Sequence, residues 1–317
     1  MTAPTPNPYL PSPDIVVVGG LNLDLVVQVP ALPRPGETIT GGDLAMHPGG
    51  KGANQAVAAA RLGAGTATIG RVGADDFGRQ LRAALDATGV CTAHVREDPG
   101  EPTGVALIAV DPSGQNSIVV APGANLRVSP DDLATARPLF ESARVCLMPL
   151  EVPLKTVAAA AESARAAGCA VILNAAPAVE LPPELLSAVD LLVANEVEAA
   201  TLLHGRLPAR PDDTALALLA LGVGGAILTL GERGLWLAQA GRLEHVPAFE
   251  VRAVDTTAAG DAFLGGLAAA RVRGAELAEA CRYGAAAAAL AVTRPGAQPS
   301  LPTAVEVQAL LGQQTKG

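Results

Sequence analysis

Residues 254–270 form a turn-rich segment with the pattern of a helix start, V-D-T-T-A-A-G-D-A-F-L-G-G-L-A-A-A. Small side chains at 258–260 let another molecule approach the backbone closely. The spacing of Phe263, Leu264 and Leu267 predicts a helix that buries one face. The first N–H groups of such a helix are unpaired and carry partial positive charge. The segment is therefore a candidate site for a phosphate group.

Asp261 lies in the first turn of this expected helix, and its carboxylate has two interpretations. An acidic side chain here stabilises a helix by capping its start. A carboxylate beside an anion site can instead take a proton from a hydroxyl group that attacks a phosphorus atom held next to it. These residues alone leave both interpretations open.

A second glycine-rich segment, H-P-G-G-K-G-A-N-Q at 47–55, leads into an alanine-rich helix. It lacks the G-x-x-x-x-G-K-[ST] spacing of a P-loop. Its glycines allow a ligand to reach the backbone, and Lys51 and Asn54 can both donate hydrogen bonds to that ligand. The alternative is a glycine-rich helix start with a solvated lysine.

Asn22 and Asp24 follow a strand that is predicted at 14–18 and ends in two glycines. Open α/β sheets bind ligands at the carboxyl ends of their strands, where an Asn and a carboxylate can hydrogen-bond neighbouring sugar hydroxyls. The alternative is an Asx turn. The segment G-G-L-N-L-D lacks the third glycine of G-x-G-x-x-G, so an oxidoreductase that binds a nicotinamide dinucleotide is poorly supported.

Polar residues also follow later strands, at Glu151, Asn195, Glu198 and T-L-G-E-R-G at 229–234. Each is individually typical of a helix cap or a turn. Together they lie on the carboxyl edge expected of the sheet, which favours a ligand site. Glu198 is a candidate for ordering Mg²⁺ through water, because Mg²⁺ takes oxygen ligands and retains several waters.

Strands alternate with helices from about residue 65 onward, which predicts a mostly parallel sheet with helices on both faces. Strands with no helix between them are predicted at 25–29, 37–40, 104–110 and 116–120. D-P-S-G between the last two is a hairpin signal. We interpret these strands as a small separate sheet that forms a lid over the site.

The composition restricts the classes of protein that fit. The 317 residues are 50% hydrophobic, enough for one large α/β domain or two small ones, and no internal repeat or composition break marks a second domain. The net charge of −9 argues against a broad nucleic-acid interface. Four scattered cysteines without C-x-x-C indicate free thiols in a reducing compartment.

The N-terminal segment at 1–13 is proline-rich and does not have the pattern of a signal peptide. The uncharged run at 214–231 is broken by glycines and fits a helix, a turn and a strand better than a membrane span. We therefore expect a cytoplasmic protein with neither membrane nor nucleic-acid partners.

Taken together, these motifs resemble those of the ribokinase-like (pfkB-type) carbohydrate kinases. G-G-K-G-A-N-Q-A, with Gly63 and Gly73, matches one family signature, and D-T-T-A-A-G-D-A-F-L-G-G-L matches the other. N-x-D, N-E-x-E, T-L-G-x-x-G and A-V-T-R-P-G-A-Q-P-S also occur in family order. The resemblance implies a three-layer α/β/α fold with a central, mostly parallel sheet and a small β-sheet lid. It covers a single kinase domain at 14–312, with lid strands at about 22–45 and 97–122 and tails at 1–13 and 313–317.

The resemblance also implies roles for individual residues. The sugar-binding residues would be Asn22, Asp24, Gly50, Lys51, Gly52, Asn54, Glu151 and Asp261. Asp261 would be the proton acceptor, and Ala258, Ala259 and Gly260 the anion hole. ATP contacts would be Asn195, Thr229, Leu230, Gly231, Glu232, Arg233, Gly234, Gly260 and Asp261. A K⁺ site, largely of carbonyl oxygens, would include Asp255, Thr257, Ala291, Arg294, Gly296 and Ser300. Ala258 departs from the wider family, which often has Gly-Ala-Gly-Asp.

The implied activity is ATP-dependent phosphorylation of O5 of D-ribose to D-ribose 5-phosphate, with Mg²⁺ and K⁺, in a homodimer joined through the lid sheets. A kinase for 2-deoxyribose or a nucleoside is the alternative. Asp24 beside Asn22 fits adjacent hydroxyls, and the 2% aromatic content offers little for stacking a purine. A non-catalytic sugar-binding protein is disfavoured by the intact A-A-G-D loop. The preferred sugar stays open.

Overall fold

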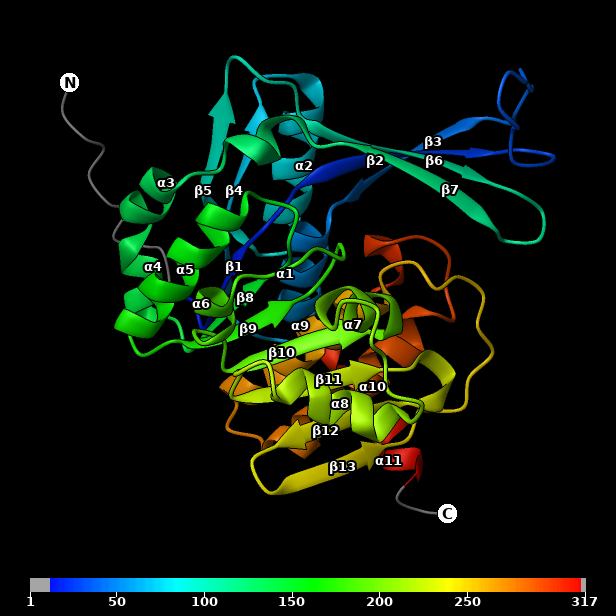
Figure 1. Cartoon of the computed structure of the whole chain (residues 1–317). Coiled ribbons are helices and arrows are strands. Elements are labelled where there is room, and N and C mark those ends of the chain that lie inside the picture. Colours follow the sequence, from blue (N-terminus) through cyan, green and yellow to red (C-terminus); the bar gives the residue numbers. More distant parts are fainter. Residues whose placement is uncertain (1–11, 315–317) are drawn as a thin grey trace, which may run out of the picture.

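The computed structural model describes residues 12–314 (Figure 1). The tails expected at 1–13 and 313–317 lie largely outside the described residues. A nine-stranded sheet crosses the molecule in the order β13-β12-β11-β10-β9-β8-β1-β4-β5. Its strands are β1 (Ile15–Val18), β4 (Thr66–Gly73), β5 (Cys91–Asp98), β8 (Val145–Met148), β9 (Ala170–Asn174), β10 (Leu191–Asn195), β11 (Gly225–Thr229), β12 (Leu235–Gln239) and β13 (Arg242–Val246).

The strands from β5 across to β11 are parallel to one another, and β12 is antiparallel to both β11 and β13. β1 shows why the sheet is buried on both faces. Its sequence I-V-V-V is fully buried, as is typical of a parallel strand between two helical layers. Ile15 and Val17 pack into one hydrophobic core, and Val16 and Val18 pack into the other.

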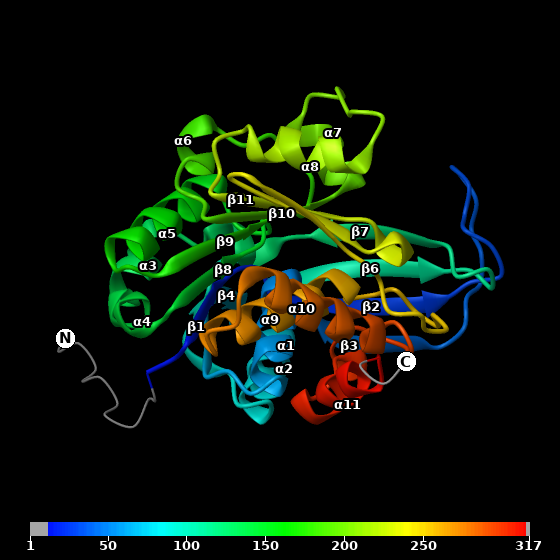
Figure 2. The same cartoon turned by 90° about the horizontal axis from the view of Figure 1, so that it is seen from below.

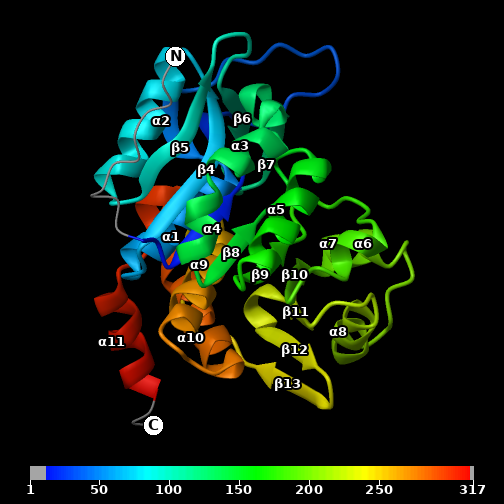
Figure 3. The same cartoon turned by 90° about the vertical axis from the view of Figure 1, so that its left-hand side faces the viewer.

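Helices cover each face of this sheet, as Figures 2 and 3 show. One core includes residues of α1 (Lys51–Arg61), α2 (Asp76–Ala87), α9 (Ala259–Val272), α10 (Leu277–Ala291) and α11 (Ala304–Gln314). The other includes residues of α3 (Pro130–Thr135), α4 (Arg137–Ser142), α5 (Leu154–Ala166), α6 (Pro183–Leu186), α7 (Glu196–Leu202) and α8 (Pro211–Leu219). Short 3₁₀ segments are η1 (Gly123–Arg127), η2 (Gly231–Arg233) and η3 (Gln298–Ser300). No helix among the described residues is long and apolar enough to cross a membrane.

A second sheet of four strands projects from the main body (Figure 1). Its order is β3-β2-β6-β7, with β2 (Asn22–Gln28), β3 (Leu44–Gly49), β6 (Gly104–Val110) and β7 (Asn116–Ala121). Strands β2 and β6 are parallel, and the outer pairs are antiparallel. The predicted combination of a mostly parallel central sheet with helices on both faces and a small second sheet is confirmed.

The strand predicted at 37–40 is wrong. The segment T-I-T has high β propensity, but the chain there is irregular, and the partner of β2 is Leu44–Gly49. This register places Gly49 opposite Asn22 and delivers the chain directly into α1. Tertiary pairing therefore overrides the local preference of residues 37–40.

Candidate active site

Asp261 occupies the third position of α9, whose N-cap is Ala258. No side chain caps this helix start. The Asp261 carboxylate instead accepts hydrogen bonds from Asn54 Nδ2 at 3.1 Å and from Gln55 Nε2 at 3.0 Å, both on α1. Asp261 therefore lies in the first turn of α9 but does not cap the helix start through a side-chain hydrogen bond. The space beside Gly260 is open, so the start of α9 is accessible to a ligand.

Two glycines bring the start of α1 against β2. Gly50, the N-cap of α1, has a φ of 87°, a conformation that glycine adopts without a steric penalty. A Cβ atom on Gly49 would lie 2.2 Å from an oxygen of Asp24, so glycine is what lets that carboxylate sit beside the helix start. On the other side, Glu151 Oε2 accepts a hydrogen bond from the Lys51 backbone N–H at 2.7 Å.

Asp24, Glu151 and Asp261 influence one another electrostatically, which places these carboxylates near a common centre. Burial, and then the charge of Asp261, raises the pKa of Asp24 to about 7. Burial raises the pKa of Glu151 to about 7 against the opposing effect of Lys51. Burial also raises the pKa of Asp261, although Lys51 and the two amide donors act in the opposite direction.

Lys51 is the cation that faces this group. Burial acts to lower the pKa of its ammonium group, but Asp261, Glu151 and Glu198 together raise it above its usual value. The ammonium group therefore stays protonated, and it can bind either a hydroxyl oxygen or a phosphoryl oxygen.

Two adjoining hollows meet at the start of α9. The first has a volume of about 210 Å³ and is bounded by Lys51, Asn195, Glu198 and residues 258–261, with Asn174 on its wall. The second has a volume of about 600 Å³ and walls that are largely apolar, including Phe249, Ala285 and Val292. The hollows share Thr229, Thr256, Ala259, Gly260 and Phe263. A polar compartment beside an apolar one suits a molecule with a phosphate chain and a planar base.

The structure brings most of the predicted nucleotide contacts to these hollows. Thr229, Leu230, Gly231, Glu232 and Gly234 line the second hollow, and Asn195 lines the first. Arg233 lines neither hollow and is half-exposed.

Arg233 donates instead to Glu196 Oε2 at 2.6 Å.

Glu198 lines the first hollow, but its oxygens accept from the backbone and side-chain nitrogens of Asn195 at 2.8 and 2.9 Å. Burial raises the pKa of Glu198.

Asp255 joins two of the segments predicted to bind a cation. Its carboxylate accepts from the Thr257 N–H at 2.9 Å and from the Gly296 N–H at 2.8 Å. Arg294 instead pairs with Glu306, and the buried Ser300 hydroxyl donates to the Ala297 carbonyl. Ala291 is the last residue of α10. Within residues 12–314, no group of three or more His, Cys, Asp or Glu side chains is arranged to hold a metal ion.

Three polar residues at the site were missed by reasoning from sequence. Gln55 donates to Asp261 and also to Asn174 Oδ1, the latter at 3.1 Å. Asn125, on η1, donates to Asn22 Oδ1 at 2.8 Å. Gln55 directly follows Asn54 in the glycine-rich motif, and that adjacency was the available signal. Asn174 and Asn125 had no local signal, since their partners are distant in sequence.

The chain matches known proteins over most of its length. The model for pfkB family carbohydrate kinases matches residues 12–304. The ribokinase of Haemophilus influenzae is 40% identical over 296 residues, which cover 92% of this chain and 96% of that protein. The crystal structure of Thermotoga maritima ribokinase has a TM-score of 0.87 at 36% identity and covers 95% and 99% of the two chains. Arabidopsis thaliana ribokinase, complexed with ribose and ATP, has a TM-score of 0.86 at 35% identity, with the same coverage.

Proposed function

The chain belongs to the pfkB family of carbohydrate kinases, and from this premise we propose that it transfers the γ-phosphoryl group of ATP to O5 of D-ribose. The products are D-ribose 5-phosphate and ADP. The observation that carries the proposal is the Asp261 carboxylate, held by two amide donors beside an uncapped helix start. The relatives that combine this fold with ribose and ATP support the choice of substrates.

In this proposal the sugar lies between β2, the start of α1 and Glu151. Asn22, Asp24 and Asn54 would hydrogen-bond the ring hydroxyls, with Lys51 and the backbone at Gly50 and Gly52. A bound sugar would also give a partner to Asn54 Oδ1, which is buried without a hydrogen bond among the described residues. Holding the sugar at several points presents the terminal hydroxyl to Asp261 in a reactive orientation.

The chemical step needs one proton acceptor and one site for negative charge. Asp261 accepts the proton of the O5 hydroxyl as the bond from O5 to the γ-phosphorus forms. The bond from that phosphorus to the bridging oxygen breaks, and ADP leaves with the electron pair. The N–H groups of Ala258, Gly260 and Asp261 and the Lys51 ammonium group stabilise charge on the phosphoryl oxygens, whereas the Ala259 N–H donates to the Thr256 carbonyl at 3.2 Å. The adenine base would lie in the larger, apolar hollow.

We also propose two metal cofactors, Mg²⁺ and K⁺. The oxygen chemistry of Glu198 fits Mg²⁺ held through water, because both carboxylate oxygens already accept hydrogen bonds. Asp255 has no ion-pair partner within the described part of the chain, and hydrogen bonds from Thr257 and Gly296 lower its pKa against the effect of burial. That persistent negative charge fits a monovalent cation beside the 255–258 loop. Mg²⁺ would neutralise charge on the triphosphate, and K⁺ would stabilise the anion-hole loop.

A homodimer joined through the second sheet completes the proposal. The sheet exposes apolar side chains at Leu44, Met46, Leu107, Ile118, Val119 and Val120, and an apolar patch of this kind is typical of a protein interface. We treat 14–312 as one kinase domain with this sheet as its lid. We place the reaction in the cytoplasm because the cysteines are free thiols.

A substrate panel tests the proposed function. The purified protein is given ATP, Mg²⁺ and D-ribose, 2-deoxy-D-ribose or nucleosides, with and without K⁺, and ADP release is measured. We expect D-ribose to give the highest kcat/KM, with phosphate on O5 by ³¹P NMR. Faster turnover of 2-deoxyribose or a nucleoside would identify that compound, rather than D-ribose, as the preferred substrate. Ribose binding by calorimetry without ADP release from any pentose would indicate a non-catalytic sugar-binding protein.

A further inference from the structure

Asn125 is a fully engaged side chain at the junction between the second sheet and the main body. It lies on η1, directly after β7, and is 1% exposed. Its Oδ1 accepts from the Leu21 N–H at 2.9 Å, and its Nδ2 donates to the Leu21 carbonyl at 3.0 Å and to Asn22 Oδ1 at 2.8 Å. Both amide hydrogens of Asn125 are therefore used, and one of them fixes a residue of the candidate sugar site.

The Asn22 side chain is closely packed where its Oδ1 meets Asn125. It pairs with Gly104 across the parallel strands β2 and β6. A Cβ atom on Gly104 would lie 2.2 Å from Asn22 Oδ1 and 2.4 Å from Asn125 Nδ2. The contact between the two amides thus depends on glycine at 104, and three separate segments of the chain build it.

The other end of the Asn22 amide is available. Its Nδ2 makes no hydrogen bond within residues 12–314, yet it is not one of the buried unpaired atoms, so it keeps some exposure to solvent. The oxygen and nitrogen of an amide have almost the same shape but opposite hydrogen-bonding character. Which end meets a ligand is decided by the partner of the other end.

We propose that Asn125 is a positioning residue that orients the Asn22 amide, so that its NH₂ group donates to a sugar hydroxyl. This inference rests on the proposed function, in which Asn22 binds the sugar. Because Asn125 donates to Asn22 Oδ1, a rotated Asn22 amide would set two NH₂ groups against each other. The substrate hydroxyl at this point must therefore act as an acceptor.

A double-mutant cycle separates this role from a merely structural one. Asn125→Ala, Asn22→Ala and the double variant are compared by the Kd of D-ribose from calorimetry and by KM and kcat. Asn125→Ala should raise the Kd and KM for ribose roughly three- to tenfold, the scale of one net hydrogen bond. The kcat and the KM for ATP should change by less than about twofold, since the lost interaction concerns sugar binding alone. In the Asn22→Ala background, Asn125→Ala should have no further effect on ribose binding.

Arg127→Ala is the matched control, because Arg127 lies in the same 3₁₀ segment and its partner is Asp98, at 3.8 Å, rather than Asn22. It should leave ribose binding unchanged. Additive effects of Asn125→Ala and Asn22→Ala, or equal losses for ribose and ATP, would assign Asn125 a purely structural role.

Asn22→Asp tests the direction of the hydrogen bond directly. The variant keeps an oxygen for Asn125 Nδ2 to donate to and replaces the outward NH₂ by a second oxygen. We expect ribose affinity to fall, because the hydroxyl can donate to the new oxygen only if it turns away from the orientation in which it accepts from Asn22. Unchanged affinity would overturn the inference even if Asn125→Ala does not fold. If the unaltered protein phosphorylates ribose and the cycle is additive, only this inference fails. If the unaltered protein phosphorylates no pentose, the proposed function fails with it.

Discussion

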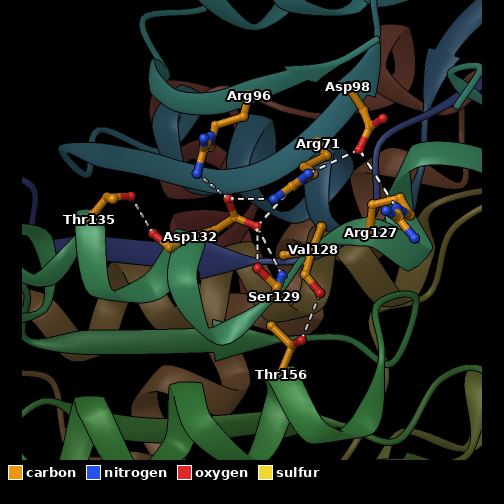
Figure 4. Close-up of polar contacts among 9 residues, drawn as sticks. All are labelled: Arg71, Arg96, Asp98, Arg127, Val128, Ser129, Asp132, Thr135 and Thr156. Carbon is orange, nitrogen blue, oxygen red and sulfur yellow. Dashed lines mark hydrogen bonds and ion pairs between the residues drawn. The ribbon is translucent and has the colours of Figure 1, made fainter. Parts of the chain in front are cut away.

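Asp132 and Asp261 occupy the same position in two different helices and have opposite surroundings. Each is the third residue of its helix, α3 or α9, and they are 1% and 6% exposed. Asp132 is surrounded by donors (Figure 4): Arg71 Nε and Nη2 at 2.9 and 3.0 Å, Arg96 Nη1 at 2.9 Å and the Ser129 N–H at 2.9 Å. Asp261 has two neutral amide donors, and its charged neighbours include other carboxylates.

The two environments shift the carboxyl groups in opposite directions. Burial tends to raise the pKa of Asp132, but hydrogen bonds from Arg71 and Ser129, with the Arg71 charge, lower it overall. Burial dominates at Asp261 and raises its pKa. A carboxylate saturated by arginines holds the structure together and has no tendency to take a proton, whereas the Asp261 carboxylate can accept one.

The helix starts differ in the same sense. Ser129 has an extended backbone, and it forms a capping box with Asp132 that closes the start of α3. Ala258 has a left-handed backbone with φ of 58°, and no side chain closes the start of α9. The protein itself completes the start of α3, whereas no side chain caps the start of α9.

The largest expected effect comes from Asp261→Asn. The amide cannot accept the hydroxyl proton, so kcat should fall by about 10²- to 10⁴-fold, the usual contribution of a catalytic base. The Kd of ribose from calorimetry and the free energy of unfolding in urea should stay close to those of the unaltered protein. The variant removes a buried charge that had no arginine partner. Turnover like that of the unaltered protein would remove Asp261 from the role of proton acceptor.

Asp132→Ala should show the reverse pattern. It leaves Arg71, whose side chain is 18% exposed, without its main partner. We expect the free energy of unfolding to fall by about 3 kcal/mol, as when a buried ion pair loses one member. At temperatures where the variant is folded, kcat should change by less than about threefold, since Asp132 lies outside both hollows.

The exposed pair of Arg79 and Asp76 provides the control for this measurement. Arg79→Ala should cost less than about 1 kcal/mol, as is usual for a surface ion pair. If Asp132→Ala were no more destabilising than Arg79→Ala, Asp132 would not stabilise the fold in the way that the contrast with Asp261 requires.

The pH dependence of stability should also differ in sign between the two regions. The pKa of Asp24 is about 7 in the folded protein and 3.8 ordinarily, so the folded state binds more protons between these values. The contribution of Asp24 to stability is therefore present below pH 4 and is lost as the pH rises through 7. The pKa of Asp132 is lowered, so its contribution is present above its ordinary pKa and is lost on acidification.

Asp24→Asn tests this sign by urea unfolding at pH 4 and pH 8. At pH 8 the variant should be more stable than the unaltered protein by about 2 kcal/mol. This is roughly half of what three pKa units correspond to, because Asp24 is partly exposed. At pH 4 this gain should vanish. A constant difference at both pH values would mean that burial does not shift the ionisation of Asp24.

The Asp261 side of this contrast could be predicted from the sequence because it depends on local motifs. Asp261 and Lys51 are embedded in glycine-rich helix starts whose spacing specifies the backbone. The partners of these motifs were not readable, because they come from remote segments. Gln55 and Asn174 are 119 positions apart, and Asn125 and Asn22 are 103 apart.

The same limit applies to the fold. Buried parallel strands were predicted well because both faces are apolar. In contrast, β5 was missed because C-T-A-H-V-R-E-D is rich in charges, which an edge strand tolerates. Two of those charged residues take part in the ion pairs around Asp132: Arg96 pairs with Asp132 itself, and Asp98 pairs with Arg71.

The smallest expected effect concerns the strained start of α9. A non-glycine residue in a left-handed conformation costs about 1–2 kcal/mol. Ala258→Gly relieves that strain but gives the unfolded chain more freedom. We expect the free energy of unfolding to rise by less than about 1 kcal/mol. Ala259→Gly, one residue later at the first position of the helix, should instead lower it, by at most about 1 kcal/mol. Urea unfolding of both variants measures the difference, and equal destabilisation by the two glycines would show that Ala258 stores no strain at the open helix start.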